Sequence, residues 1–294
     1  MEMLMVIQMA IIEAKIQEWD NMKDKIIILL GIIFIGAFLF IAYKYKSNMS
    51  DYDFKIYFWN AGKADAILLS KNNKYIMIDT GEEELSEEIL AYFKNNNITK
   101  LDYLIITHFD KDHVGSASSI IDNIEVETVL QSNSPKESEY YTAYLSALSN
   151  KEITPITVNG NYEISFEGLK IIVNGPTMVY DNSASNNSSL IVSITYNDNN
   201  FLFMGDAENA RIKDFVSNNK ETFDFIKIPY HGRKLKRMNE LIDNIKPEYA
   251  VITSGVDTNN IDTINTLNNH QVKTYLTRNG DIYVYSDGVN IKVK

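Results

Sequence analysis

The chain has 294 residues, of which 45% are hydrophobic, enough for one large domain or two small ones. Its net charge of −11 disfavours general binding to nucleic-acid backbones, so a phosphate-bearing substrate would need a local basic patch. Cysteine is absent, which excludes disulfides and thiolate metal sites and leaves histidine, carboxylates, asparagine and water as metal ligands.

The first distinct segment is a run of apolar residues without a charge, residues 26–43. Lysines flank it on both sides, and its length is just sufficient to cross a bilayer core. A buried core helix would normally have a polar face, and a cleavable signal peptide would end in small residues; this run has neither. We therefore expect an uncleaved transmembrane anchor.

The lysines before the anchor predict its orientation. Lys23 and Lys25 favour a cytoplasmic N-terminus, which would place the following domain outside the cytoplasm of a single-pass cell-membrane protein. Residues 1–25 have two interpretations: an interfacial helix, or residues preceding a true start at Met22. Residues 44–53 are a polar linker.

Strand-like and helical runs alternate over the rest of the chain, which predicts a layered α/β sandwich. The expected strands lie at 54–59, 65–70, 74–79, 101–107, near 161–174, 189–196, 200–205, 223–230, 248–254 and 272–277, with a closing hairpin over 280–293. The expected helices lie at 84–97, near 136–150, 207–219, 238–245 and 261–269.

The segment "THFDKDHVG" (107–115) directly follows a strand that is apolar enough to be buried on both faces. It contains four candidate metal ligands: His108, Asp110, Asp112 and His113. Alternation along an extended segment would send the first three to the same side. Imidazoles suit zinc, copper, iron and nickel, and carboxylates extend the choice to manganese and magnesium. A solvated loop with two incidental histidines is the alternative, which four donors in so short a segment disfavour.

This pattern resembles the H-x-H-x-D-H signature of the metallo-β-lactamase superfamily. Asp110 departs from the usual histidine, and is similar to the branch typified by the hydrolase domain of ComEC-type competence proteins, where T-H-x-D-x-D-H-x-G is normal. Bacterial phosphorylcholine esterases share this variation. Further segments resemble family motifs in family order: "FWNAGKADAILL" (58–69), "YIMIDTG" (75–81), "SNNSSLIVSITYNDNNFLFMGDAE" (185–208), "IKIPYHGRK" (226–234) and "YLTRNGDIYVYSDG" (275–288).

The resemblance implies a four-layer αββα metallo-β-lactamase-like sandwich over residues 54–294, preceded by one transmembrane helix. It implies two divalent ions, zinc or alternatively manganese. The implied ligands are His108, Asp110, Asp112, His113, Asp206, which would bridge the ions, and His231. Asp112 and Asp79 are the implied catalytic carboxylates, with Asp79 supporting the metal loop from behind. The implied substrate-binding residues are Asn186, Ser189, Tyr230, Arg233 and Lys234.

Two departures from the family pattern lie near the last ligand. Tyr230 replaces the first histidine of the family's H-H-G, and Arg233 replaces a small polar residue; both change the expected substrate contacts. A basic run surrounds these positions: Lys227, Arg233, Lys234, Lys236 and Arg237. It is either a phosphate-holding surface or a solvated face. The remaining histidine, His270, is expected at the surface.

We expect a membrane-anchored dinuclear metallohydrolase that acts on a phosphoester, either a nucleic-acid strand or a phosphorylated surface polymer. Three alternatives stay open: a metal-dependent esterase or lactonase, a phosphorylcholine esterase, and a non-catalytic scaffold on the membrane. The ligand set disfavours β-lactam hydrolysis. A single predicted span cannot form a DNA channel, so transport of DNA would require a separate channel partner.

Overall fold

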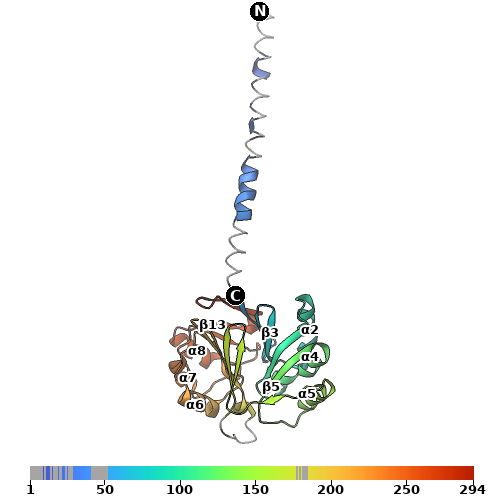
Figure 1. Cartoon of the computed structure of the whole chain (residues 1–294). Coiled ribbons are helices and arrows are strands. Elements are labelled where there is room, and N and C mark those ends of the chain that lie inside the picture. The colour runs from blue at the N-terminus through green and yellow to red at the C-terminus, as the bar shows by residue number, and fades with distance from the viewer. Residues whose placement is uncertain are drawn as a thin grey trace, which may run out of the picture. The chain divides into compact units, whose positions relative to one another are not determined.

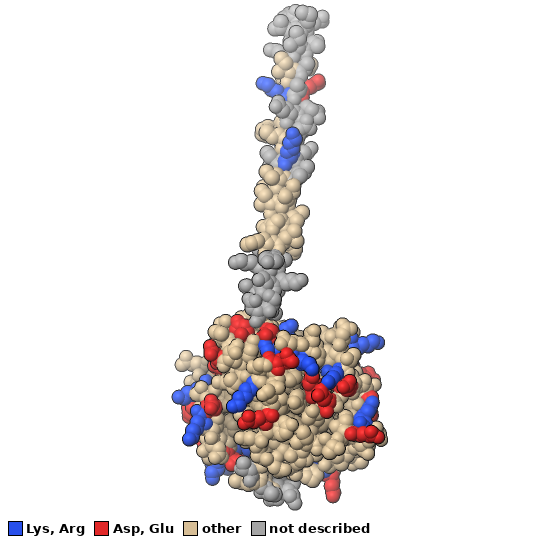
Figure 2. Space-filling view, viewed as in Figure 1, with Lys and Arg blue, Asp and Glu red and all other residues tan. Residues whose placement is uncertain are grey.

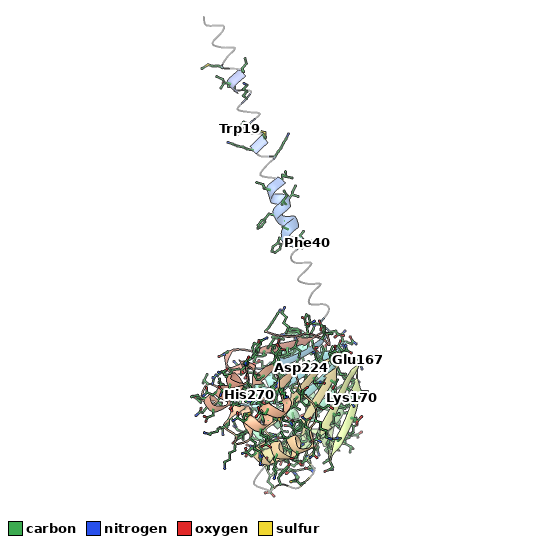
Figure 3. The ribbon with its side chains drawn as sticks, turned by 90° about the vertical axis from the view of Figure 1, so that its left-hand side faces the viewer. Trp19, Phe40, Glu167, Lys170, Asp224 and His270 are labelled. Carbon is green, nitrogen blue, oxygen red and sulfur yellow. The ribbon has the colours of Figure 1, made fainter. Side chains whose placement is uncertain are left out.

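The computed structural model describes residues 52–176, 178, 180 and 185–294, together with residues 29–40 and scattered positions between 9 and 25. Residues 29–40 are helical, and side chains such as Phe40 project outward from this helix (Figure 3). The other residues of the predicted anchor, 26–28 and 41–43, lie outside the described residues. Within the described part, no helix has the length and apolar character needed to cross a membrane. Residues 53–294 form a compact unit separate from residues 1–52.

Two β-sheets form the middle of the unit of residues 53–294 (Figure 1). The first sheet has the strand order β15-β14-β1-β2-β3-β4-β5-β6 and the second has the order β13-β12-β11-β10-β9-β8-β7. The first contains β1 (Phe54–Phe58), β2 (Ala66–Lys71), β3 (Lys74–Thr80), β4 (Lys100–Ile106), β5 (Glu125–Gln131), β6 (Ile156–Thr157), β14 (Ile282–Ser286) and β15 (Ile291–Val293). The second contains β7 (Asn161–Phe166), β8 (Leu169–Asn174), β9 (Ile191–Tyr196), β10 (Asn199–Phe203), β11 (Phe225–Lys227), β12 (Tyr249–Ile252) and β13 (Lys273–Leu276).

Helices cover the outer face of each sheet, on opposite sides of the unit (Figure 1). The first sheet packs against α2 (Ser86–Asn95), α4 (Ala117–Asn123) and α5 (Glu139–Asn150), and the second against α6 (Asn209–Asn218), α7 (Met238–Ile245) and α8 (Ile261–Asn269). A third apolar cluster lies between the sheets, where Phe54 and Phe58 of β1 meet Phe201 and Phe225. The predicted αββα sandwich is therefore confirmed for this unit.

Shorter helical segments complete the chain: α3 (Lys111–Val114) and the 3₁₀ turns η1 (Glu83–Leu85), η2 (Ser185–Ser188), η3 (Pro229–Gly232) and η4 (Thr277–Asn279). The elements α3, α4, β5 and β6 were not predicted. β5 pairs with β4 in parallel. Its only consecutive buried residues are the last three of its seven. Its first half, "EVET", carries two acids and has no apolar run that would indicate a strand.

Strand direction collects the polar residues at one edge of both sheets. β3, β4 and β5 are parallel, and so are β10, β11, β12 and β13. The segments that follow β4, β10, β11 and β12 therefore meet at the same edge, as in other parallel α/β sheets. These segments contain His108, Asp206, His231 and Thr253 respectively.

Candidate metal centre

The loop after β4 changes conformation halfway along the histidine motif. Asp110 is the extended residue that precedes α3, and α3 begins at Lys111. The prediction that alternation would align Asp112 with His108 is therefore wrong, because Asp112 and His113 lie in a helical turn. Gly115 ends this turn where a Cβ atom would lie 2.5 Å from Lys111 O and 2.6 Å from Glu83 N, so a larger residue would displace the loop.

Four side chains converge at the centre of the edge: Asp112, His113, Asp206 and His231. One ligand atom from each lies within 4.8 Å of the others, and all four residues are buried. His231 Nε2 is 3.1 Å from Asp206 Oδ2 and 3.4 Å from Asp112 Oδ2, and His113 Nε2 is 3.3 Å from Asp206 Oδ1. The sequence motifs that are far apart in the chain therefore bring their donors to one point.

The donor atoms fit divalent ions. The Nε2 atoms of His108, His113 and His231 and Oδ1 of Asp206 are buried and have no hydrogen-bond partner among the described residues. Leaving such atoms without partners is costly in a protein interior unless something else binds them. A set of imidazole nitrogens and carboxylate oxygens matches zinc and, through the carboxylates, manganese.

His108 and Asp110 lie beside this group in a looser arrangement. His108 Nε2 is 3.8 Å from Asp110 Oδ1, and the rings of His108 and His113 are 4.1 Å apart between centroids. Burial, followed by the charge of His113, lowers the pKa of His108 to about 3, which keeps its imidazole neutral and able to bind metal. Asp110 Oδ1 also accepts hydrogen bonds from Lys136 Nζ and Ser185 Oγ, both at 2.7 Å.

Asp79 lies behind His113. Its Oδ1 accepts from the backbone N–H of Thr107 at 2.7 Å, and its Oδ2 accepts from Thr107 Oγ1 at 2.6 Å and from His113 Nδ1 at 2.7 Å. The bond to Nδ1 orients the imidazole so that Nε2 faces the centre. Asp79 is fully buried, so the structure gives it the part of a positioning residue rather than a group that touches substrate.

His231 sits in a strained turn. Tyr230, His231 and Gly232 all have left-handed backbone conformations, with φ of 52°, 50° and 71°. Two of them are not glycine, a cost that is typical of functional sites. His231 Nδ1 donates to the carbonyl of Thr253 at 3.0 Å, and Asn260 Nδ2 donates to the carbonyl of His231 at 2.7 Å. These bonds direct Nε2 into the centre.

Three residues at this site were not predicted from the sequence. Asp65 and Lys63 were not expected there, and Lys227 was expected in a basic run and not as a buried residue. Asp65 Oδ1 accepts from Thr253 Oγ1 at 2.6 Å, and its Oδ2 forms an ion pair with Lys227. Lys227 Nζ donates to the carbonyl of Gly205 at 3.0 Å and lies 3.8 Å from Asp206 Oδ1. The segment 58–69 contained the signal for Asp65, because its single acid precedes an apolar strand.

Lys63 lies at the solvent side of the centre, with Nζ 3.0 Å from Asp112 Oδ2. Burial alone would raise the pKa of Asp112, but the proximity of His231 and the charge of His113 outweigh burial and hold that pKa well below its ordinary value. Asp112 is thus an ionised carboxylate between the buried histidines and an accessible lysine.

The predicted substrate-binding residues have different positions. Ser189 is fully buried; its Oγ accepts from Asp206 N at 3.1 Å and lies 3.4 Å from His108 Nδ1, so it orients those two groups. Asn186 Nδ2 donates to Glu208 at 2.8 Å. The Arg233 guanidinium lies over the Tyr230 ring, 5.4 Å from its centroid, in an exposed position near His231.

The basic run is not one surface. Lys227 is fully buried, Lys234 pairs with Asp262 at 3.1 Å, and Arg237 pairs with Glu240 on α7. Of the run, Arg233 is the residue that lines a pocket beside the centre. Over the face seen in Figure 2, acidic and basic side chains are interspersed.

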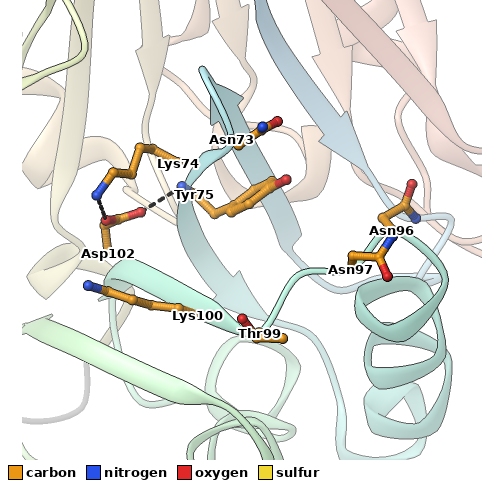
Figure 4. Close-up of a pocket in the computed structure, with 8 residues that line it drawn as sticks. All are labelled: Asn73, Lys74, Tyr75, Asn96, Asn97, Thr99, Lys100 and Asp102. Atoms are coloured by element: carbon orange, nitrogen blue, oxygen red, sulfur yellow. Dashed lines mark hydrogen bonds and ion pairs between the residues drawn. The ribbon is translucent and has the colours of Figure 1, made fainter.

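Another pocket, of about 460 Å³, lies at the opposite edge of the first sheet (Figure 4). It is formed where β3 and β4 begin, and Asp102 links Lys74 Nζ and the backbone N–H of Tyr75 there. The residues that line it include no histidine: Asn73, Lys74, Tyr75, Asn96, Asn97, Thr99, Lys100 and Asp102. It is therefore separated from the candidate metal centre by the length of the strands.

Comparisons with known proteins agree with this geometry. The profile of the Metallo-beta-lactamase superfamily matches residues 59–255. Recombination protein 2 of Haemophilus influenzae is 28% identical over 204 residues, 67% of this chain and 24% of the relative. ComE operon protein 3 of Bacillus subtilis is 26% identical over 179 residues, 58% of this chain and 22% of the relative. The chain thus matches less than a quarter of the length of either relative.

A solved structure shows the same fold. The metallo-beta-lactamase fold protein YhfI of Bacillus subtilis superposes with a TM-score of 0.53 at 8% sequence identity. The match covers 82% of this chain and all of that protein. At this identity the likeness extends to the fold and not to substrate.

Proposed function

Because the chain belongs to the metallo-beta-lactamase superfamily, a family of metal-dependent hydrolases, we propose that its centre holds two divalent ions and hydrolyses phosphodiesters. The observation that carries the proposal is a set of six buried or half-buried donors with two cations, Lys63 and Arg233, on its accessible side. Developing negative charge on a phosphoryl group is stabilised by such fixed cations. A neutral ester or lactone would draw less benefit from them.

In this proposal, Asp112, His113, Asp206 and His231 form the tighter ligand group, and His108 and Asp110 complete the second, with Asp206 shared. When bound, divalent ions would act as Lewis acids and lower the pKa of water to near neutrality. Asp79 and the Thr253 carbonyl hold His113 and His231 in the tautomers that present Nε2. Zinc is the expected metal and manganese the alternative.

Hydrolysis would form a bond between the water oxygen and phosphorus and break the bond from phosphorus to the departing alkoxide. Asp112 would accept the proton that the water loses on the carboxylate oxygen that does not bind metal, and return it to the alkoxide. Lys63, with Nζ 3.0 Å from Asp112 Oδ2, would face the phosphoryl oxygens. Arg233 would hold the same group from the side of His231.

The test is a substrate panel on the full chain in detergent. Bis-p-nitrophenyl phosphate, p-nitrophenyl phosphorylcholine, single-stranded DNA and a lactone are each assayed with zinc and with manganese. We expect turnover of the simple diester and of DNA. Turnover of the lactone alone would favour the esterase reading, turnover of the phosphorylcholine ester alone would favour that esterase class, and inactivity of a metal-loaded protein on all four would favour a scaffold.

We further propose that residues 26–43 anchor the enzyme in the cell membrane with the hydrolase domain outside the cytoplasm. The apolar run and the preceding Lys23 and Lys25 support this orientation. Protease added to intact spheroplasts should digest the domain, whereas protection until lysis would show the reverse. If the substrate is DNA in transit, we propose that a separate channel protein delivers it.

A further inference from the structure

A second pocket, of about 470 Å³, opens directly beside the candidate metal centre. Three cationic side chains line it, Lys63, Arg233 and Arg278, and Asp257 is the one acid among the lining residues. This balance contrasts with the chain as a whole, in which Asp and Glu outnumber Lys and Arg by 39 to 28. The pocket is therefore a local basic site on an acidic protein, the feature that an anionic substrate requires.

Each cation is tied to the metal centre by a short path. Lys63 contacts the ligand Asp112 directly. Arg233 follows the ligand His231 by two residues. Arg278 donates from Nη1 to Asn260 Oδ1 at 3.1 Å, and the Nδ2 of that asparagine donates to the carbonyl of His231. Binding in the pocket and binding at the centre are thus supported by the same residues.

Arg233 and Arg278 are available to a ligand. Among the described residues neither has a carboxylate within ion-pair distance; Arg233 contacts the Tyr230 hydroxyl at 3.5 Å, and Arg278 contacts the neutral Asn260 amide. The pocket is open to solvent on the side of Gly62 and Val256. No heavy atom lies within 4 Å of where a Cβ of Gly62 would be, and Val256 is 80% exposed. Aromatic side chains are missing from the residues that line the pocket, so it offers no ring on which a base could stack.

We infer that this pocket binds a second phosphate of the substrate, the one adjacent to the phosphate that is cleaved. The inference rests on the proposed phosphodiesterase function and specifies its substrate as a single-stranded phosphodiester chain that is recognised by its backbone. Arg278, whose link to the metal centre runs through Asn260, binds only this flanking phosphate. Arg233 and Lys63 lie between the two phosphates.

The experiment compares Arg278→Gln with wild type on two kinds of substrate. The substitution should lower kcat/KM on a short oligothymidylate by about 10- to 100-fold more than it lowers kcat/KM on bis-p-nitrophenyl phosphate. This is the size expected for a hydrogen bond to a charged group. Arg278→Lys should restore part of the loss. Lys170→Gln is the matched control, since it removes one positive charge from the opposite edge of the second sheet (Figure 3).

A modified substrate completes the test. Replacing the flanking phosphate of the oligothymidylate by a neutral methylphosphonate should cause the same loss in wild type and almost no further loss in Arg278→Gln, because both changes remove one interaction. Losses that multiply, or equal losses on the oligomer and on the simple diester, overturn the subsite. The metal content of Arg278→Gln, measured in parallel, should equal that of wild type.

The same variants separate failure of the subsite from failure of the proposed function. If no phosphodiester is cleaved, binding of fluorescein-labelled oligothymidylate is followed by anisotropy. Binding that weakens on Arg278→Gln and on the methylphosphonate would keep the subsite and reject the phosphodiesterase. Cleavage of both substrates with no selective loss in the variant would keep the phosphodiesterase and reject the subsite.

Discussion

Lys136 Nζ lies 2.7 Å from Asp110 Oδ1, so a predicted metal ligand is already engaged by a cation of the same protein. An ion bound by Asp110 would have to displace this ammonium or share the carboxylate with it. The second metal position should therefore bind its ion more weakly than the group of Asp112, His113, Asp206 and His231.

Lys136→Gln should raise affinity for the second ion, because it removes the competing charge. Titration calorimetry of the chelator-treated protein should show two binding steps in wild type and a smaller gap between them in the variant, by about tenfold or more. Lys151→Gln, on the same side of the first sheet but bonded to the Asp122 carbonyl, should leave both steps in place. A second step that weakens in Lys136→Gln would contradict the prediction.

Asp206→Ala should reduce the number of bound ions. Asp206 lies within the tighter group, 3.3 Å from His113 and 3.1 Å from His231, and the proposal makes it the ligand that is shared with the second ion. Elemental analysis should give about two metals per chain in wild type and about one or fewer in the variant. Asp102→Ala removes a carboxylate at the opposite edge and should not change the count; a full count in Asp206→Ala would reject the bridging role.

Asp79→Asn should weaken metal binding without removing a ligand. The amide keeps the shape of the carboxylate but no longer favours the His113 tautomer that presents Nε2 to the centre. Competition with a chelator should show a loss of about 10- to 100-fold in affinity. Asp224→Asn is the control, because its carboxylate accepts from the backbone N–H of Asn200 away from the centre (Figure 3). Unchanged affinity in Asp79→Asn would show that Thr107 alone suffices to hold the loop.

Arg211→Met should destabilise the domain. Arg211 is 1% exposed and donates to the carbonyl of Asn174 at 2.7 Å, to Asn174 Oδ1 at 2.6 Å and to the carbonyl of Ser189 at 3.2 Å. Methionine fills a similar volume but leaves these buried acceptors unpaired, a loss of about 3–5 kcal/mol in the free energy of unfolding by urea. Arg237→Met removes an exposed ion pair and should cost less than about 1 kcal/mol.

His270→Gln should lower stability at acidic pH only. His270 lies at the surface as predicted, with Nδ1 bonded to the Thr266 carbonyl at 2.8 Å and Nε2 3.0 Å from Asp243 (Figure 3). The backbone carbonyl, followed by Asp243, raises the pKa of His270 above its ordinary value near 6.5. Its stabilising effect is therefore complete below the unfolded-state pKa and is lost as pH rises through the folded-state pKa.

Thermal unfolding of wild type and His270→Gln should accordingly differ at pH 5 and converge at pH 8. A difference that grows with pH would show that the protonated imidazole is not the stabilising form.

The layers of the fold and most of its strands and helices could be predicted, because hydrophobic runs and turn residues are local signals in the sequence. Strands β1 to β4 and β9 to β13 and the helices between them lie close to their expected ranges. The helical turn that carries Asp112 was not predictable from alternation, since its start at Lys111 depends on packing of Gly115 against Glu83. β5 was missed because Glu125 and Glu127 interrupt its first half, which therefore has no continuous apolar run.

The missed site residues depend on contacts between distant parts of the chain. The bond from Thr253 to Asp65 joins residues 188 positions apart, and no local pattern indicates it. Lys227 looked like one member of a charged run, yet it is fully buried because Asp65 and the Gly205 carbonyl compensate its charge. Lys234 follows Arg233 directly in the sequence and looked equivalent to it, but Lys234 forms an ion pair with Asp262.

The donors at the centre come from both sheets, with His108 and His113 following β4 of the first and Asp206 and His231 following strands of the second. An ion held by all of them can bind only when the two halves of the sandwich are packed together. The supply of metal then becomes part of the folding equilibrium: free ion at about 100 times its dissociation constant adds about 2.7 kcal/mol to the free energy of unfolding. Where metal is scarce, the same chain would open more often and be degraded sooner, so metal starvation would lower its abundance as well as its activity.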